Sequence, residues 1–286
     1  MASQIEIISR VVDYIESNLN SRLDLALLAE AVHYSKFHLH RMFTDTVGLT
    51  IHEYAQRRQL TEAAKLLVFS PKPVLEIAIL AGYESQQAFT GIFKAMYKTT
   101  PGCYRQREEF YPLQLRFTLR ENKAETVLKK SDIVFAETKD IPDWLELTCL
   151  AIDGYPCLVE DEFLANLRRS MNERRALILR NGNILVGAAA FSDQTGEIQF
   201  LAVHPQYRNR GVIKLFLDAL MDNLLSGRII SITTYRKGDN ADTGYRKELK
   251  RLGFAERELL IEYGYPTQRF ELSPKSEQSQ QPQQQK

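Results

Sequence analysis

The sequence predicts a multidomain protein, with an all-α domain first and an α/β (α+β) domain after it. Two observations predict this order. Up to about residue 110, apolar residues recur with the period of an amphipathic helix. From about residue 132, short strand patterns alternate with helix patterns. With 286 residues, 44% of them hydrophobic, the chain is long enough for two domains that each have a core.

The first part contains a series of short helices. Ser35 and Thr50 are good N-cap residues for two of them. Pro71 and Pro73 end the longest helix, because proline cannot continue a helix and disfavours helix just before it. We expect helices over residues 3–19, 24–32, 35–43, 50–68, 74–81, 85–97 and 100–104.

A repeat runs through these helices. The stretch that begins at Tyr34 has an echo that begins at Tyr83, which is 83 − 34 = 49 residues later. The aligned positions are Ala29, Tyr34, Phe43 and Thr50 in the first copy and Ala78, Tyr83, Phe93 and Thr100 in the second, which has one extra residue. Repeats longer than about 40 residues usually indicate duplicated units. Here each unit has the pattern of a helix-turn-helix, so we expect a homeodomain-like double helix-turn-helix.

The second helix of each unit has an apolar face and a face that suits DNA. Arginine can contact a phosphate or guanine, an aromatic ring can contact a thymine methyl group, and glutamine can bind adenine in a bidentate manner. The candidate DNA-binding residues are Lys36, Phe37, His38, His40 and Arg41 in the first copy, and Ser85, Gln86, Gln87, Thr90 and Lys94 in the second. One such face alone would be read equally well as ordinary solvated surface, and the repeat favours the DNA interpretation. Arg57 and Arg58, on the helix between the units, are either phosphate contacts or solvated side chains.

Residues 4–107 resemble the DNA-binding domain of the AraC/XylS family of transcription regulators. The resemblance rests on Tyr34-Ser35-Lys36-Phe37-His38-Leu39, Arg41-Met42-Phe43, Gly48, Arg57, Thr61, Ala63, Ile77-Ala78, Gly82-Tyr83, Ser85-Gln86-Gln87, Phe93-Lys94, Pro101 and Tyr104-Arg105. It implies that both reader helices enter successive major-groove segments of double-stranded DNA, spaced by about one helical turn, ~34 Å. It also implies RNA polymerase and a small-molecule effector as partners.

Two reader positions depart from the pattern of that family. His40 stands where close relatives carry glutamine, and Gly91 stands where they carry arginine. Glycine has no side chain to contact a phosphate. The second reader helix is therefore expected to bind more weakly than the first, or to have a relaxed sequence preference.

The rest of the chain is expected to hold a linker, the second domain and a tail. Residues 113–119 alternate apolar and polar residues like a strand that could complete the second sheet or pair between protomers. Strands are expected over residues 176–180, 184–191, 197–203 and 229–235, and helices over 214–225 and 243–252. Gly182-Asn183 indicates a hairpin. The expected division is a DNA-binding domain at 1–110, strand and linker at 111–131, the second domain at 132–272, and a disordered tail at 273–286.

A second strong motif lies at residues 201–212. A strand there leads into an arginine-rich turn and then a helix, and a helix N-terminus is a natural seat for a pyrophosphate. The motif, with Leu252-Gly253-Phe254, resembles the GNAT acyltransferase fold. The resemblance implies acetyl-CoA or another acyl-CoA as ligand. The implied cofactor-binding residues are Val203, Arg208, Asn209, Arg210, Gly211 and Val212.

Catalysis by this GNAT-like domain is a separate question. Glu197 stands where some members keep a general base, or it is a solvent-facing strand residue. The usual tyrosine acid is replaced by Leu249, and Tyr245 lies one turn earlier. Ile213 replaces a small residue and is expected to crowd the pyrophosphate. The domain is therefore expected to act as a ligand sensor or scaffold, with an active N-acetyltransferase as the alternative.

Composition limits the remaining possibilities. A net charge of +1 gives no whole-chain attraction to nucleic acid, so DNA binding must come from local arrangement. Three cysteines without metal-ligand spacing indicate reduced thiols and no metal. No signal peptide is evident at the N-terminus, and no apolar run approaches the ~20 residues of a membrane helix. We expect a cytoplasmic protein with no membrane partner.

Overall fold

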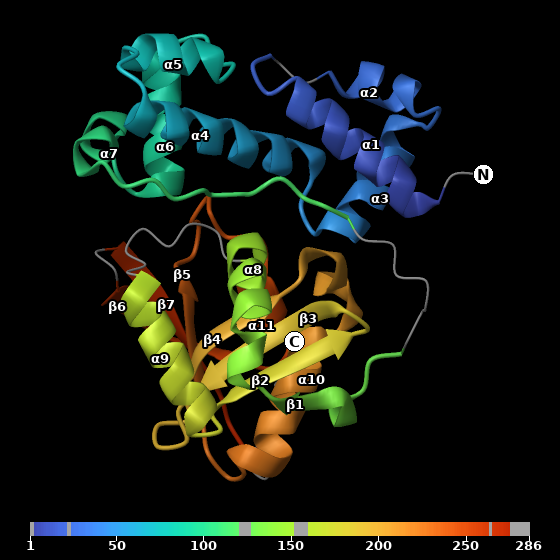
Figure 1. Cartoon of the computed structure of the whole chain (residues 1–286), viewed down its shortest axis with the longest axis vertical. Coiled ribbons are helices and arrows are strands. Elements are labelled where there is room, and N and C mark those ends of the chain that lie inside the picture. The colour runs from blue at the N-terminus through green and yellow to red at the C-terminus, as the bar shows by residue number, and fades with distance from the viewer. Residues whose placement is uncertain (1–2, 22–23, 120–126, 152–159, 263–264, 275–286) are drawn as a thin grey trace, which may run out of the picture. The chain divides into compact units, whose positions relative to one another are not determined.

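The computed structural model describes residues 3–21, 24–119, 127–151, 160–262 and 265–274 (Figure 1). The chain divides into two compact units. The first unit comprises Met1–Glu125 and Cys149–Pro156, and the second comprises Thr126–Thr148 and Cys157–Lys286. Most of the expected linker and of the expected disordered tail lies outside the described residues.

The first unit is helical, as predicted. Its helices are α1 (Gln4–Ser17), α2 (Leu25–Ala31), α3 (Lys36–Val47), α4 (Ile51–Phe69), α5 (Val74–Leu80), α6 (Gln86–Tyr97) and α7 (Pro101–Arg107). The expected N-caps are confirmed. The Ser35 hydroxyl accepts a hydrogen bond from the backbone N–H of His38, and Thr50 forms a capping box with Glu53. Every expected helix of this unit is thus present, with ends that differ by a few residues.

The sequence repeat is also a structural repeat. The Tyr34 backbone N–H donates to the Ala29 carbonyl over 3.0 Å, and the Tyr83 N–H donates to the Ala78 carbonyl over 3.0 Å. Ser85 caps α6 through the N–H of Ala88 in the same way that Ser35 caps α3. Two copies of one turn therefore place α3 after α2 and α6 after α5.

Each copy has its own packing. In the first copy, Phe43 is fully buried and packs edge-on against Tyr54 of α4, with ring centroids 5.9 Å apart. In the second copy, aromatic rings from α6 and α7 pack together, and Phe93 stacks on Tyr97 at 4.4 Å. Tyr104 of α7 lies against both rings. The helix α4 passes between the two copies and contacts α3 on one side and α5 and α7 on the other (Figure 1).

The strand expected over residues 113–119 is absent, and that prediction is wrong. The segment forms no regular secondary structure and runs along α4 back toward α1 (Figure 1). The burial of its side chains does not follow the alternation, because Leu115 is 36% exposed and Gln114 is 2% exposed. Leu113 and Phe117 are buried in the first unit, at 3% and 4% exposure. The backbone N–H groups of Leu113 and Phe117 are hydrogen-bonded to side chains of α4 instead of to a neighbouring strand.

The second unit is built on two antiparallel sheets. Its strands are β1 (Ile133–Phe135), β2 (Ala176–Asn181), β3 (Ile184–Phe191), β4 (Ile198–Val203), β5 (Ile230–Tyr235), β6 (Ala255–Glu262) and β7 (Tyr265–Leu272). The strand orders are β1-β2-β3-β4 and β5-β7-β6. The hairpin between β2 and β3 is confirmed at Gly182, which has a φ of +57°.

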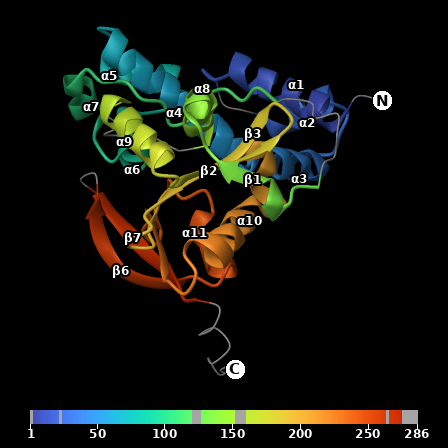
Figure 2. The ribbon, with the colours of Figure 1, turned by 60° about the horizontal axis from the view of Figure 1, so that its bottom comes forward.

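The α-helices that follow β1 along the chain are α8 (Ile141–Ala151), α9 (Glu160–Asn172), α10 (Val212–Ala219) and α11 (Tyr245–Arg251). α9 packs on β2 and β3, while α10 and α11 lie on the opposite side of the sheets (Figure 2). A Cβ added at Gly187 of β3 would lie 2.7 Å from the Phe216 ring, so glycine lets α10 approach the sheet closely. The helix expected over residues 214–225 is shorter than predicted, because Leu220–Leu224 forms a π-helical turn.

The two sheets meet at the beginning of β4. The Ser231 N–H of β5 donates to the Gly196 carbonyl over 3.1 Å, and an isolated parallel bridge joins Glu197 to Ser231. A Cβ at Gly196 would lie 2.3 Å from the Ile229 carbonyl oxygen, so this approach requires glycine. In the described residues, β4 forms a regular ladder with β3 only, because β5 belongs to the other sheet. The β5 side of β4 thus has no regular strand partner beyond this bridge.

Candidate nucleic-acid and cofactor sites

The first reader helix, α3, has one buried and one exposed face. Its apolar residues Leu39, Met42 and Phe43 are buried in the core of the first unit. The sequence-predicted DNA contacts, Lys36, Phe37, His38, His40 and Arg41, are all exposed. The Phe37 side chain is 80% exposed, which is an unfavourable position for an apolar phenyl ring. An exposed aromatic ring beside a guanidinium and two imidazoles is a set of groups that can contact base edges in a major groove.

A ring contact at the beginning of α3 orients one of these groups. The His38 imidazole stacks on the Tyr34 ring, with centroids 5.3 Å apart and planes 15° apart. Tyr34 belongs to the turn that the repeat defines, and His38 lies one helical turn beyond it. The stack restricts the rotamers of His38 before any partner binds, which lowers the entropic cost of ordering it.

The second reader helix, α6, repeats the arrangement with fewer charged groups. Phe89, Phe93, Met96 and Tyr97 are buried. Of the predicted contacts, Gln86, Gln87 and Lys94 are exposed and Thr90 is half-buried. Ser85 already uses its hydroxyl to cap the helix, over 3.2 Å to the N–H of Ala88. The exposed face of α6 therefore offers two amides and one ammonium group, against the guanidinium, ammonium and two imidazoles of α3.

Gly91 leaves a gap in the exposed face of α6. It lies in the middle of the helix, and a Cβ built at this position meets no atom within 4 Å. Gly91→Ala is expected to raise the free energy of unfolding by about 0.5–1 kcal/mol, because glycine is unfavourable within helices. Thermal or denaturant unfolding measures this directly.

Gly91→Arg tests the role of the same position in binding. The new guanidinium would lie on the exposed face, so DNA affinity is expected to rise and the slope of log affinity against log salt to steepen by about one. Gly102→Arg is the matched control, because Gly102 is also exposed with open space around it but lies on α7. Equal effects of the two substitutions would show that α6 does not face the DNA.

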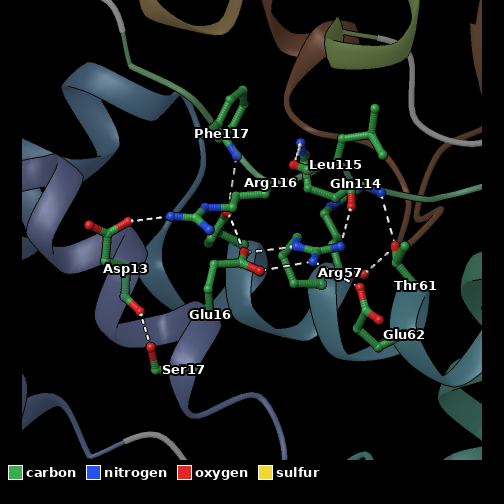
Figure 3. A network of polar contacts seen from close by, with 12 residues as sticks. Asp13, Glu16, Ser17, Arg57, Thr61, Glu62, Gln114, Leu115, Arg116 and Phe117 are labelled. Carbon is green, nitrogen blue, oxygen red and sulfur yellow. Dashed lines mark hydrogen bonds and ion pairs between the residues drawn. The ribbon is translucent and has the colours of Figure 1, made fainter.

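Both interpretations of Arg57 and Arg58 are wrong. The two side chains are buried, at 3% and 7% exposure, so neither is a solvated group or a phosphate contact. Arg58 donates two hydrogen bonds to the Glu16 carboxylate of α1, both over 2.8 Å, and one to Glu62 over 2.9 Å. The network around Glu16 and Gln114 is drawn in Figure 3. Arg58 is thus a structural residue that joins α1 to α4.

Burial raises the pKa of two tyrosines of the first unit. Burial raises the pKa of Tyr104 to about 12. Burial, with the nearby charge of Glu16, raises the pKa of Tyr54 well above its ordinary value. A group whose pKa is raised on folding adds stability below its unfolded pKa, which for tyrosine is about 10, and that stability is lost as pH rises through the folded pKa.

The helical signal of the first unit is therefore expected to be stable near pH 9 and to weaken as the pH rises from about 10 to about 12. Circular dichroism in the far ultraviolet, recorded against pH, measures the change. Tyr104→Phe removes one titrating hydroxyl, so the loss of stability should be less steep in that variant. An unchanged alkaline profile in this variant would exclude Tyr104 as a contributor.

The predicted cofactor-binding motif lies between β4 and α10. Val203 ends β4, Pro205–Arg210 forms a 3₁₀ turn, and Gly211 adopts a φ of +72° just before α10 begins at Val212. A Cβ at Gly211 would meet no atom within 4 Å. The beginning of α10 is therefore sterically open on the side where Gly211 lies.

Polar groups surround this open helix start. Asn209 and Arg210 are exposed, and Arg208 is half-buried. The Arg210 guanidinium lies over the Tyr207 ring, 5.1 Å from its centroid. Val203 and Val212 are buried in the core, so only their backbone groups could contact a ligand. The crowding expected from Ile213 is not found, because its side chain is also buried in the core.

The candidate catalytic residues Glu197 and Tyr245 lie on different elements of the second unit. Glu197 is half-buried at the beginning of β4, at the opposite end of the strand from the motif. Tyr245 is the first residue of α11, and its hydroxyl oxygen is buried. Leu249 is fully buried in the core, as an apolar residue should be.

Neither a metal site nor a membrane-spanning helix occurs in the ranges that the structure describes. Among those residues, no group of three or more His, Cys, Asp or Glu side chains could hold a metal ion. In the same ranges, no helix is both long and apolar enough to span a membrane.

Comparison with known proteins agrees with both motifs. Residues 28–107 match the family described as "Helix-turn-helix domain", and residues 142–254 match the "Acetyltransferase (GNAT) family". The HTH-type transcriptional activator AarP from Providencia stuartii is 40% identical over 108 residues, which cover 38% of this chain and 80% of AarP. The chain belongs to the AraC/XylS family of helix-turn-helix transcription regulators, and its C-terminal part is a GNAT-family domain.

Other similar proteins match part of the chain. The "Right origin-binding protein" from Escherichia coli (strain K12) is 37% identical over 131 residues, which cover 43% of this chain and 45% of that protein. The chain therefore spans less than half the length of this longer relative. A GNAT-family acetyltransferase from Bacillus cereus, known as a crystal structure, is 15% identical with a TM-score of 0.39, and the match covers 50% of this chain and 96% of that one.

Proposed function

We propose that this protein is a transcription regulator that binds double-stranded DNA specifically through α3 and α6. One observation carries the proposal: the same turn and the same serine cap present two amphipathic helices from one compact unit. A single helix with a polar face is common on protein surfaces. Two copies with equivalent hydrogen bonds, in a chain of the AraC/XylS family, support a bipartite reader of DNA.

The two readers are proposed to contribute unequally. The exposed face of α3 carries Arg41 and Lys36 with two imidazoles, while α6 carries Lys94 as its cation beside Gln86 and Gln87. Phosphate contacts supply much of the affinity for DNA, and base contacts supply the sequence preference. The α3 half-site is therefore expected to dominate affinity, and the α6 half-site to add register and a preference for adenine.

Selection of duplexes from a random-sequence pool tests the proposal. The full chain is expected to enrich sites with two conserved blocks about one helical turn apart, ~10 base pairs. The double variant Arg41→Ala with Gln87→Ala is the control and should enrich no such site. A wild-type protein that retains DNA without any sequence enrichment would contradict the proposal.

The second unit is proposed to bind acetyl-CoA or another acyl-CoA at the beginning of α10. The open backbone at Gly211 and the basic residues Arg208 and Arg210 fit a pyrophosphate, which helix N-termini attract. Among the described residues, the β5 side of β4 has no ladder beyond the Glu197–Ser231 bridge, so its backbone groups could hydrogen-bond with the extended arm of an acyl-CoA. Asn209, with the backbone of Val203 and Val212, completes the proposed site.

A sensory or scaffolding role is proposed for that site in preference to catalysis. Acyl-CoA would supply an activated thioester. Acyl transfer from it needs a base within hydrogen-bonding reach of the acceptor and an acid near the departing thiolate. Leu249 cannot serve as an acid, and the hydroxyl of Tyr245 is buried. The alternative of an active N-acetyltransferase is favoured by the match to the GNAT family and by Glu197, the candidate general base.

Titration with acetyl-CoA separates these roles. Calorimetry is expected to detect saturable binding that Arg210→Ala weakens and Lys214→Ala leaves unchanged, since Lys214 is exposed and paired with Asp218 on α10. No free thiol should be released above the background rate with amine acceptors. Rapid thiol release would favour the enzyme, and absence of binding would overturn the proposed ligand.

The remaining partners are proposed from the family. RNA polymerase would be contacted at target promoters, and a small molecule, for which acyl-CoA is our candidate, would act as effector in the cytoplasm. Reconstituted transcription from a selected site, with and without acetyl-CoA, measures both effects. An unchanged transcript level in every condition would contradict a role in regulation.

A further inference from the structure

The segment of residues 111–117, here called the strap, contacts both helix-turn-helix copies. At its beginning it is held by the second copy. The Tyr111 N–H donates to the Tyr104 hydroxyl over 3.0 Å. The hydroxyls of Tyr104 and Tyr97 donate to the Tyr111 carbonyl over 3.2 and 3.3 Å. Tyr97 ends α6, the second reader helix, so the strap is anchored directly to that helix.

The middle of the strap is fixed to α4. The Thr61 hydroxyl accepts the backbone N–H groups of both Leu113 and Gln114, each over 3.1 Å. Figure 3 shows Thr61 and Gln114 in this network. Arg58 donates to the Gln114 carbonyl over 3.0 Å. Leu113 and Gln114 are 3% and 2% exposed, so these bonds are shielded from water. An unsatisfied backbone group in such a place would be costly, and Thr61 satisfies two at once.

The end of the strap is held by the N-terminal part of α4 and packs in the core of the first copy. The Phe117 N–H donates to the Tyr54 hydroxyl over 3.2 Å, and the two rings stack with centroids 5.6 Å apart. The Tyr54 hydroxyl in turn donates to Glu16 of α1 over 2.7 Å. Phe117 packs in the same buried cluster as Phe43 of α3, the first reader helix. The strap therefore reaches the packing around both reader helices.

This arrangement adds a second connection between the two copies. The first connection is α4, and long helices are rarely straight but curve along their length. A strap anchored at Tyr97, Thr61 and Tyr54 opposes such bending, because bending would break buried hydrogen bonds. Two linked binding modules gain affinity from each other only when their geometry permits simultaneous contact.

We propose that the strap fixes the relative placement of α3 and α6 and so sets the spacing of DNA half-sites that the protein accepts. Thr61 and Tyr54 are positioning residues that act through the strap and do not touch DNA. The DNA consequence rests on the proposed function, while the geometric consequence does not.

A distance measurement tests the geometric part without DNA. Spin labels at Asp45→Cys on α3 and Ala88→Cys on α6, both exposed positions, report the separation of the reader helices in the full chain. Cys103, Cys149 and Cys157 are replaced by serine for this purpose. Thr61→Val removes the acceptor for two strap N–H groups at nearly constant shape. It is expected to broaden or displace a narrow distance distribution.

Thr46→Val is the matched control. Like Thr61, Thr46 is a buried threonine whose hydroxyl donates to the carbonyl four residues earlier. Unlike Thr61, it accepts a hydrogen bond from the Gln4 side chain and none from the strap. This variant is expected to keep the parent distribution. Equal distributions in both variants, at comparable loss of thermal stability, would overturn the proposal, whatever the protein does with DNA.

DNA probes test the functional part. With a duplex selected by the wild-type protein, Thr61→Val is expected to weaken binding about tenfold, the loss of linkage between two modules. On a duplex with one half-site scrambled, the affinity of the Thr61→Val variant should lie within about twofold of that of the wild type. Equal losses on both probes would make Thr61 merely structural. If no duplex is selected, the proposed function is contradicted, and the distance measurement alone then tests whether the strap fixes the two reader helices.

Discussion

Arg58→Ala is expected to lower the free energy of unfolding of the first unit by about 3 kcal/mol, at the lower end of what breaking a buried ion pair costs. Burial opposes the charged form of Arg58, but hydrogen bonds to Glu16 raise its pKa above the ordinary value, so it stays charged. Its removal leaves the Glu16 carboxylate, which is 11% exposed, without its bidentate partner. The Gln114 carbonyl also loses its buried donor.

The measurement can distinguish the two units within the intact chain. The chain has a single tryptophan, Trp144, which lies in the second unit, so its fluorescence follows that unit. Far-ultraviolet circular dichroism is dominated by the helices of the first unit. Arg58→Ala should therefore move the dichroism transition and leave the fluorescence transition in place.

Arg116→Ala is the control for Arg58→Ala. Arg116 also forms an ion pair with α1, over 2.7 Å to Asp13, but both side chains are more than half exposed. Exposed pairs contribute about 0–1 kcal/mol. If both substitutions cost the same, burial of the Arg58 pair would not matter and its structural role would be refuted.

The sequence predicted the parts of the fold that have local signals. The helices of the first unit follow from apolar periodicity, the serine and threonine caps, and the prolines after α4. The strands β2 to β5 follow from β-branched and apolar runs between turns. The repeat also identified the exposed residues of α3 and α6, because burial of one helix face requires exposure of the other.

Contacts between distant residues could not be predicted. Glu62 lies four residues after Arg58 on the same helix, but Glu16 lies 42 residues before it. Residues 113–119 alternate like a strand in sequence, but their burial does not alternate: Leu113, Gln114 and Phe117 are buried and Leu115 is exposed. Alternation alone does not identify the neighbour that covers a side chain. The prediction of a strand was wrong for this reason.

The strands β6 and β7 were missed because charged residues interrupt their apolar pattern. Arg257 pairs with Glu271 over 2.7 Å, and Arg269 pairs with Glu258 over 2.9 Å, across the two strands. Cross-strand ion pairs stabilise a ladder, yet in the sequence they resemble a solvated loop. Ile213 shows the reverse case, because its place in the motif suggested a crowded turn and its side chain is in the core.

Arg41→Ala is expected to weaken binding to a selected duplex by about 1–3 kcal/mol, the usual worth of a good base contact, or roughly 5- to 150-fold. Arg41 is exposed on α3, and its guanidinium is the group on that helix best suited to bind guanine in a bidentate manner. Stability should change little, because surface substitutions away from caps and ion networks usually have small effects. Equilibrium binding at two salt concentrations measures the loss.

Arg10→Ala distinguishes a base contact from loss of charge. Arg10 is an exposed arginine on α1 of the same unit, outside both reader helices, so its removal changes the net charge equally. If Arg41 reads a base, its removal weakens the selected duplex much more than a scrambled one, and relaxes preference at one position of the site. If it only contacts phosphate, both duplexes weaken alike and the salt slope falls by about one. Undiminished binding to the selected duplex would place α3 outside the groove, and the repeat would then need another explanation.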